Sequence, residues 1–329
     1  MEEKKKVTLY ILEILKTYSD EQHPLSTGEI LSLLDKQYGA IIERRTVYRT
    51  IDTLNDLGYT IKTWKDNGSG YFLTNRDFNE GEIILLCNAI HSSNFISITQ
   101  SEELIRKLLK TQSKYQSRLY IDSVYKPNRK KMESDDLTDT LQILTHAIKD
   151  NICISFTYKH YNVSKKCMIP DTELRTFEPR YIVYYEERPY LAATVPGTDT
   201  FRHFRIDRMA DICPLCQKPM SRFDKTDAYE YAKDKFFMFT DEKTDVTFHI
   251  QEDKVPLAVD FFGKDLMFVK EKDGYRFHVR GSKTGLLLFA QRNIDCMYII
   301  EPESMKEAMR TILENAMQHY NRVGEISQL

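Results

Sequence analysis

The stretch Ile41-Ile42-Glu43-Arg44-Arg45-Thr46-Val47-Tyr48-Arg49-Thr50-Ile51, which leads into Leu54-Asn55-Asp56-Leu57-Gly58-Tyr59, decides how the first quarter of the chain folds. Val47, Ile51 and Leu54 stand at i, i+4 and i+7, the spacing that places side chains on one face of a helix. Gly58 follows at the point where a helix C-terminus favours a residue that tolerates positive φ. The pattern therefore predicts a short helix with an apolar inner stripe that ends near Gly58.

The other face of this helix carries arginine and tyrosine side chains, because Arg45, Tyr48 and Arg49 repeat the helical spacing. Arg can pair bidentately with guanine and Tyr can bind a phosphate, so this face suits a DNA groove. A helix-turn-helix reads DNA mainly with the N-terminal part of its second helix. The residues predicted to contact DNA, including two lysines beside a predicted wing turn, are Arg44, Arg45, Thr46, Tyr48, Arg49, Lys62 and Lys65. The alternative is a solvated helix face with ordinary surface lysines.

The neighbouring segments complete this predicted domain. Residues 7–18 carry a helical stripe, and Ser26 with Glu29 has the spacing of a capping box at the start of a second helix. Residues 60–65 and 71–73 read as two strands around a turn at 66–70. Three helices and a two-stranded wing predict a winged helix-turn-helix over residues 1–75.

The rest of the chain divides by its hydrophobic period. Residues 76–136 predict a helical linker, with one stripe formed by Ile83, Leu86 and Ile90 and another that includes Leu104. Residues 137–213 predict one helix and then a small β-barrel, because several short strands follow in about 60 residues. After a polar connector over residues 214–240, residues 241–329 have the βαββαβ order of a ferredoxin-like domain. The predicted fold class is therefore α+β and multidomain.

Composition narrows the function. The 329 residues carry a net charge of −2, and the predicted DNA-binding domain has ten Lys/Arg against eleven Asp/Glu, so any nucleic-acid binding depends on local placement. We expect a cytoplasmic protein, because the chain has no signal-peptide core or membrane-length apolar run and its six cysteines are scattered. One C-x-x-C, Cys213 to Cys216, is too little for zinc, so no metal is expected. We also expect neither a cofactor nor an enzyme, since the phosphate-binding and nucleophile-elbow glycine motifs are missing.

The four predicted blocks, taken in order, resemble the WYL-domain transcriptional regulators. Besides the Arg44–Ile51 helix, the resemblance lies in Phe156-Thr157-Tyr158, Arg175, Glu178-Pro179, Tyr190-Leu191, Phe204-Arg205-Ile206-Asp207-Arg208 and Ile299-Ile300-Glu301-Pro302. It implies a winged helix-turn-helix, a helical linker, a Sm-like WYL barrel and a C-terminal extension called WCX. One departure is that Pro189 stands where the family has the Trp of its Trp-Tyr-Leu motif.

The resemblance also implies a basic effector pocket in the barrel. Its predicted ligand-binding residues here are Tyr158, Arg175, Tyr190, Arg202, His203 and Arg205. Arg donors together with Tyr and His suit an anionic ligand such as a nucleotide or a nucleic-acid strand. The alternative is structural, with the tyrosines in the core and a salt bridge between Asp207 and Arg208.

These observations predict a DNA-binding transcriptional regulator, with a repressor favoured over an activator. We expect it to bind double-stranded operator DNA as a homodimer, because two half-sites supply enough contacts for useful affinity. The alternative is a nucleic-acid processing accessory or enzyme that uses the winged helix only for docking.

Overall fold

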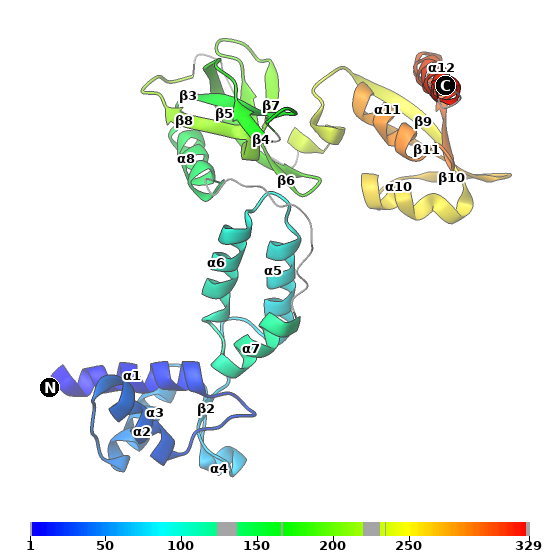
Figure 1. Cartoon of the computed structure of the whole chain (residues 1–329). Helices are drawn as coiled ribbons and strands as arrows, with labels where there is room; N and C mark the ends of the chain where they lie inside the picture. Colours follow the sequence, from blue (N-terminus) through cyan, green and yellow to red (C-terminus); the bar gives the residue numbers. More distant parts are fainter. Residues whose placement is uncertain (1, 124–136, 166, 220–230, 234, 327–329) are drawn as a thin grey trace. The chain divides into compact units, whose positions relative to one another are not determined.

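The computed structural model describes residues 2–123, 137–165, 167–219, 231–233 and 235–326 (Figure 1). Its helices and antiparallel sheets form two compact units, Met1–Asp135 and Asp136–Leu329, and each is described by itself. The mixed composition agrees with the predicted α+β class.

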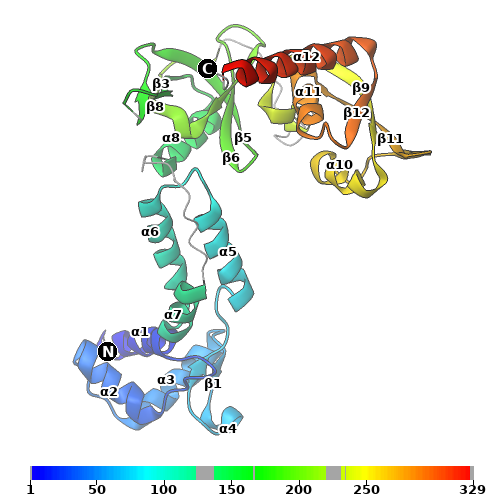
Figure 2. The ribbon, with the colours of Figure 1, turned by 45° about the vertical axis from the view of Figure 1, so that its right-hand side comes forward.

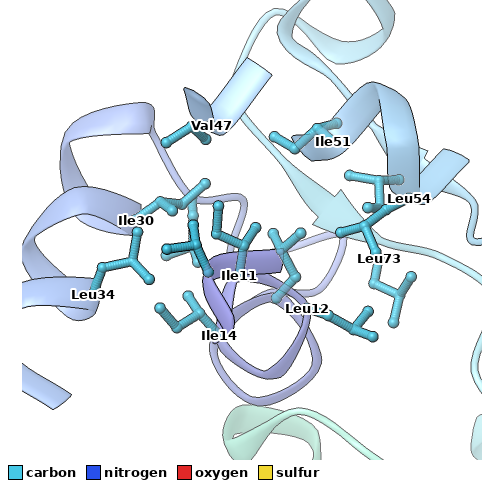
Figure 3. Close-up of a cluster of buried hydrophobic side chains, with 13 residues drawn as sticks. Ile11, Leu12, Ile14, Ile30, Leu34, Val47, Ile51, Leu54 and Leu73 are labelled. Atoms are coloured by element: carbon cyan, nitrogen blue, oxygen red, sulfur yellow. The ribbon is translucent and has the colours of Figure 1, made fainter. Parts of the chain in front are cut away.

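The first unit begins with three helices, α1 (Glu2–Tyr18), α2 (Thr27–Tyr38) and α3 (Arg44–Asp56), followed by strands β1 (Ile61–Lys62) and β2 (Phe72–Leu73). The two strands pair antiparallel. One buried cluster joins all three helices to the strands, and α1, α2 and α3 contribute Ile11, Ile30 and Ile51 to it, respectively (Figure 3). Because each helix supplies one apolar stripe to this cluster, the helical periods read from the sequence are the ones that the fold uses.

Local signals set the ends of these helices. The side chain of Ser26 accepts a hydrogen bond from the backbone N–H of Glu29, and the Glu29 carboxylate accepts one from the N–H of Ser26, which is the predicted capping box. The backbone at Gly58 has a φ of 95°, the positive value predicted just beyond the end of α3. The capping box satisfies backbone N–H groups at the start of α2 that the helix itself cannot pair.

The predicted wing is wrong in part. Instead of a strand over residues 60–65, only Ile61–Lys62 is extended, and Trp64–Asn67 forms a single helical turn, α4. Thr63 and Asp66 form a capping box around this turn, and Gly68 closes it with a φ of 68°. Four residues with local capping contacts therefore override the strand pattern.

Three further helices complete the first unit: α5 (Glu80–Ser92), α6 (Ile98–Leu109) and α7 (Lys114–Ser123). Ile83, Ile105 and Tyr120 belong to their shared buried cluster. Two of the predicted stripe residues lie elsewhere, because Leu86 and Leu104 are 36% and 38% exposed. The described part of the predicted linker, which ends at Ser123, is mainly helical, but its buried stripe is narrower than predicted.

Polar contacts connect α1 to the helices of the linker. The guanidinium of Arg76 donates hydrogen bonds to the carbonyl oxygens of Lys16, Ser19 and Thr111. The buried carboxylate of Asp20 accepts a hydrogen bond from the hydroxyl of Ser113. Arg76 therefore joins the end of α1 to the turn between α6 and α7.

The second unit opens with helix α8 (Leu137–Asp150) and an antiparallel sheet. Along the sheet the strands stand in the order β4, β3, β5, β6, β7, and β8 pairs with the first half of β3, from Ile154 to Tyr158. Strand β5 is shared, because its first residues pair with β3 and its later residues with β6. The six strands are β3 (Ile154–Asn162), β4 (Cys167–Pro170), β5 (Arg175–Tyr185), β6 (Arg188–Thr194), β7 (Phe201–Arg205) and β8 (Met209–Pro214).

The C-terminal part of this unit has the predicted βαββαβ order. Its sheet runs β10, β11, β9, β12, and residues from α10 and α11 pack into the same buried cluster as the sheet. Figure 2 shows the ribbons of α10 and α11 beside the strands of this sheet. The long helix α12 (Glu303–Ile326) buries Met305 in that cluster. The other elements are β9 (Lys243–Ile250), α10 (Val255–Phe262), β10 (Phe268–Glu271), β11 (Gly274–Ser282), α11 (Lys283–Arg292) and β12 (Met297–Glu301). Short 3-10 turns η1 (Ile206–Arg208), η2 (Phe236–Met238) and η3 (Glu252–Lys254) complete the described elements.

Candidate DNA-reading helix and effector cluster

Helix α3 separates its two kinds of side chain as the sequence predicts. Val47, Ile51 and Leu54 are at most 2% exposed, and they hold the helix against α1 and α2. The opposite face carries Arg44, Arg45 and Arg49, which are exposed, and Tyr48, which is 44% exposed. The helix thus presents a rigidly supported row of hydrogen-bond donors.

The N-terminus of α3 adds a second feature. Glu43 occupies the N-cap position, but its side chain makes no capping hydrogen bond to the helix. Unpaired N–H groups at a helix N-terminus attract anions such as phosphate. Thr46, in the first turn, is half-buried, so it has less freedom to contact a partner than the three arginines.

The wing presents one aromatic residue that the sequence pattern did not single out. Trp64 opens α4 and is 60% exposed, between the exposed residues Lys62 and Lys65. A large ring beside two cations offers both an aromatic face and positive charge to a phosphate-bearing partner. The sequence feature that indicates the position of Trp64 is the Thr63–Asp66 capping box, because this spacing predicts a helical turn here rather than a strand.

In the second unit, Arg205 forms an ion pair with the buried carboxylate of Asp207. Its Nε lies 3.0 Å from Oδ1 of Asp207 and its Nη2 lies 2.5 Å from Oδ2, a bidentate pair. The second cation on Asp207 is Arg188, at 3.5 Å. Burial lowers the pKa of Arg205 and the contacts with Asp207 raise it by more, so the net shift is upward. The alternative salt bridge to Asp207 therefore exists, but with Arg205 and Arg188 rather than with Arg208.

Tyr158 connects Arg205 to Arg175. The phenol oxygen of Tyr158 accepts a hydrogen bond of 3.2 Å from the backbone N–H of Arg205, and the guanidinium of Arg175 lies over the Tyr158 ring at 5.6 Å. Burial raises the pKa of Tyr158, which keeps the phenol protonated. Arg175 also pairs with Asp171 at 2.5 Å, yet its buried Nε has no hydrogen-bond partner.

The remaining predicted ligand residues separate into two groups. Tyr190 pairs with Arg205 in the β6–β7 register and so belongs to the same cluster. Arg202 is exposed on the opposite face of β7 from Arg205. His203 shares the face of Arg205, but the segment after β8 covers it. The structure therefore brings together Tyr158, Arg175, Tyr190 and Arg205, and leaves Arg202 and His203 apart.

The contacts of His203 define its protonation. Its Nδ1 lies 2.5 Å from the carbonyl oxygen of Met238, which can only accept, so Nδ1 carries the hydrogen. Its Nε2 lies 3.0 Å from the hydroxyl of Tyr231, which can donate to it. Burial lowers the pKa of His203, with a smaller opposing effect from Met238. The ring is thus a neutral structural link between β7 and the connector.

We expect this link to weaken in acid. Because the pKa of His203 is below its ordinary value in the folded state, the unfolded chain binds a proton that the folded chain does not, and stability falls as the pH drops through about 6.5. Urea unfolding followed by circular dichroism between about pH 7.5 and 5.5 should show this slope in the native protein and less of it in His203→Gln. His278→Gln, at a 60% exposed side chain, is the control. Equal slopes in all three proteins would contradict the assignment.

A buried ion pair lies in the same sheet. Glu178 and Arg180 are 0% and 4% exposed, and Oε2 of Glu178 lies 2.6 Å from Nη2 of Arg180. The hydroxyl of Thr194, opposite Glu178 in the β5–β6 register, contacts both residues at 3.0 Å. Arg180 was not among the predicted functional residues, and its full enclosure points to a structural role.

With this geometry established, comparison with known proteins places the sheet in a family. Residues 139–214 match the family model described as WYL domain. The chain contains a WYL domain. This confirms the predicted resemblance, and the domain holds both the Arg205 cluster and the Glu178–Arg180 pair. The match covers α8 and the six strands, from Asp139 in the helix to Pro214 at the end of β8.

A curated relative is similar over a longer region. The uncharacterized HTH-type transcriptional regulator YobV of Bacillus subtilis (strain 168) is 25% identical over 239 residues, which are 70% of this chain and 74% of the relative. The aligned region is thus about three times as long as the WYL domain, and the likeness extends beyond that domain.

Two solved structures are similar at low scores. Proteasome accessory factor B/C (PafBC) of Arthrobacter aurescens gives a TM-score of 0.28 at 16% identity; 96% of this chain is covered, and the chain spans 49% of that structure's length. A structure described as a CRISPR Cas-related protein gives a TM-score of 0.37 at 15% identity and covers 96% of this chain and 85% of its own. Scores at this level support no inference about function.

Other candidate features carry no site among the described residues. No group of three or more His, Cys, Asp or Glu side chains there is placed to hold a metal ion. Cys213 and Cys216 are exposed free thiols. None of the described helices is both long enough and apolar enough to cross a membrane.

Proposed function

We propose that the protein is a DNA-binding transcriptional regulator, a repressor rather than an activator, that binds operator DNA as a homodimer. The observation that carries the proposal is α3, where a buried stripe fixes the helix and a row of exposed arginines covers its outer face. The likeness to an HTH-type transcriptional regulator supports the same function.

The outer face of α3 has the chemistry of a major-groove reader. Arg44 and Arg45 lie in its first turn, where a recognition helix contacts base edges, and Arg49 lies one turn later. Arg is the side chain that most often reads guanine, through a bidentate contact. The acidic residue Asp52 is exposed on the same face, so contact is best confined to the N-terminal half of the helix.

The wing supplies a second proposed contact. Lys62 and Lys65 would bind phosphates, and Trp64 would contact the sugar-phosphate backbone or a groove edge. Because the wing is a separate element from α3, its contacts would fix the orientation of the helix on the duplex. This extends the predicted contact set by one residue, Trp64.

The WYL domain is proposed to bind an anionic effector at the Tyr158–Arg175 end of the cluster. Arg205 is held by Asp207, whereas Arg175 has a buried N–H without a partner and lies beside an aromatic ring. A buried donor without a partner costs free energy, which an incoming oxygen atom would recover. Effector binding would then shift the population of DNA-binding dimers.

The single tryptophan gives a direct test of DNA binding. We expect the fluorescence of Trp64 to change saturably when the purified protein is titrated with duplex DNA from upstream of its own gene. A scrambled duplex of equal length and composition should bind more weakly at the same salt concentration. The affinity of a regulator for its specific site exceeds its affinity for non-specific DNA by several orders of magnitude. Equal affinity for both duplexes, or no binding to either, would overturn the proposed function.

A further inference from the structure

A groove runs along α6 in the first unit, and no residue of α3 lines it. Its volume is about 490 Å³, within the range of small-molecule sites. The walls come from α6 and α7, with Thr17 of α1 and His91 of α5 at the sides. The lining residues on α6 extend from Glu102 to Leu109, about two turns, so the groove is elongated.

The floor of this groove is apolar. Ile105 and Leu109 line it and are 7% and 6% exposed, and Ile121 of α7 lines it while remaining 51% exposed. An occupant that covered the exposed part of Ile121 would remove apolar surface from water, which favours binding.

The rim of the groove is basic. Arg106, Lys110 and Lys114 line it, with Glu102 as the carboxylate among the lining residues. Within the described part of the chain, neither Arg106 nor Lys110 forms an ion pair, whereas the neighbouring Lys107 pairs with Glu103 at 2.7 Å. The ammonium of Lys114 lies 4.4 Å from the centre of the Tyr18 ring. The rim therefore keeps two cations available for an anionic group.

We propose that this groove binds an amphiphilic anion, a carboxylate on an unbranched or aromatic apolar body. The apolar body would lie along Ile105 and Leu109, and the carboxylate would lie between Arg106 and Lys110. A free phosphate or a nucleic-acid backbone would satisfy the cations but leave the apolar floor uncovered. A neutral hydrocarbon would leave the cations unused, so the amphiphile uses both properties of the groove.

The position of the groove gives its occupant a route to the DNA-reading helix. Thr17 belongs to α1, which shares a core with α3, and α6 and α7 belong to the linker. An occupant that contacts both would hold α1 against the linker. This consequence rests on the proposed function, whereas binding in the groove does not, and it is tested without DNA.

The test is calorimetric titration of the full chain with laurate below its critical micelle concentration. Dodecyltrimethylammonium, which has the same chain length and the opposite charge, is the matched ligand control. We expect saturable binding of laurate with a stoichiometry of one per chain, and binding of the cation at least about tenfold weaker.

Variants of the rim locate the site. Arg106→Gln with Lys110→Gln should weaken laurate binding on the order of tenfold, because two exposed charge contacts contribute about 0.5–1 kcal/mol each. Lys107→Gln, on the same helix and outside the groove, should leave the affinity unchanged. Circular dichroism melting checks that each variant is folded. Equal affinity in the native protein and the double variant, or equal binding of both amphiphiles, would overturn the proposal.

Discussion

Arg180→Met is expected to destabilise the WYL domain by about 3–5 kcal/mol, because it leaves the buried carboxylate of Glu178 without its cation. The pair is enclosed, with Glu178 fully buried and Arg180 4% exposed. Thr194 would remain as a partner of the carboxylate, and the backbone N–H of Gly197 lies 3.4 Å from its other oxygen. Neither contact supplies a charge. The loss is a large share of the 5–15 kcal/mol that stabilises a typical domain.

A double variant separates the ion pair from simple packing. Glu178→Met with Arg180→Met removes both charges, and we expect it to be clearly more stable than Arg180→Met alone. Arg202→Met, on the neighbouring strand β7 at an exposed position, should change stability by no more than about 0.5 kcal/mol. Urea unfolding followed by far-ultraviolet circular dichroism measures all three. If Arg180→Met were as stable as Arg202→Met, the pair would have no structural role.

This pair shows what the sequence does not reveal. Glu178 was recognised as part of the WYL pattern, but neither Arg180 nor Thr194 stood out, because their contacts depend on the pairing of β5 with β6. A bulge in that pairing falls between Pro179 and Tyr181, which no alternation pattern predicts. Strand registers over 16 residues of separation are set by the folded sheet, not by local spacing.

Features that depend on sequence signals within one helix or strand were predicted correctly. The stripe of Val47, Ile51 and Leu54 is buried as its spacing requires, and the Ser26–Glu29 capping box forms. The βαββαβ order of the last 90 residues also follows from changes of period that each element carries by itself. These predictions needed no knowledge of distant contacts.

Where two local sequence signals compete, the one that forms side-chain contacts to the backbone prevails. Residues 60–65 alternate as a strand would, yet Thr63 and Asp66 have the spacing of a capping box, and α4 forms there. In the linker, Leu86 and Leu104 have helical spacing with buried residues but lie at the edge of the stripe, so they remain partly exposed. The period of a helix predicts its inner face, but it does not give the width of that face.

The effector cluster needed tertiary information in a different way. Alternation on β7 correctly placed His203 and Arg205 on one face. The alternation could not show that Tyr231 and Met238, which follow β8 in the sequence, contact the ring of His203. Nor could it show that Arg205 pairs with Asp207. Two neighbouring side chains on one face therefore have different roles, and contacts with residues 28 and 35 positions away in sequence determine which is which.

Arg45→Ala with Arg49→Ala is expected to weaken binding to operator DNA by at least about 30-fold. Each base or phosphate contact by Arg contributes about 1–3 kcal/mol, and both side chains are exposed on the outer face of α3. The domain has no excess of positive charge, so no general field compensates for the lost contacts. Fluorescence titration with the upstream duplex at fixed salt concentration measures the affinity.

The matched control removes the same charge elsewhere in the first unit. Lys107→Ala with Arg118→Ala changes two exposed cations on α6 and α7, and we expect an effect of less than about threefold, because distant charges are screened at physiological salt. The Arg45 and Arg49 variant should also show a shallower dependence of affinity on salt, since fewer counterions are released on binding. Its fold should be unchanged, as Val47, Ile51 and Leu54 keep their packing against α1 and α2. If both double variants lost affinity equally, binding would reflect total charge and not a reading helix, and α3 would have no special place on the DNA.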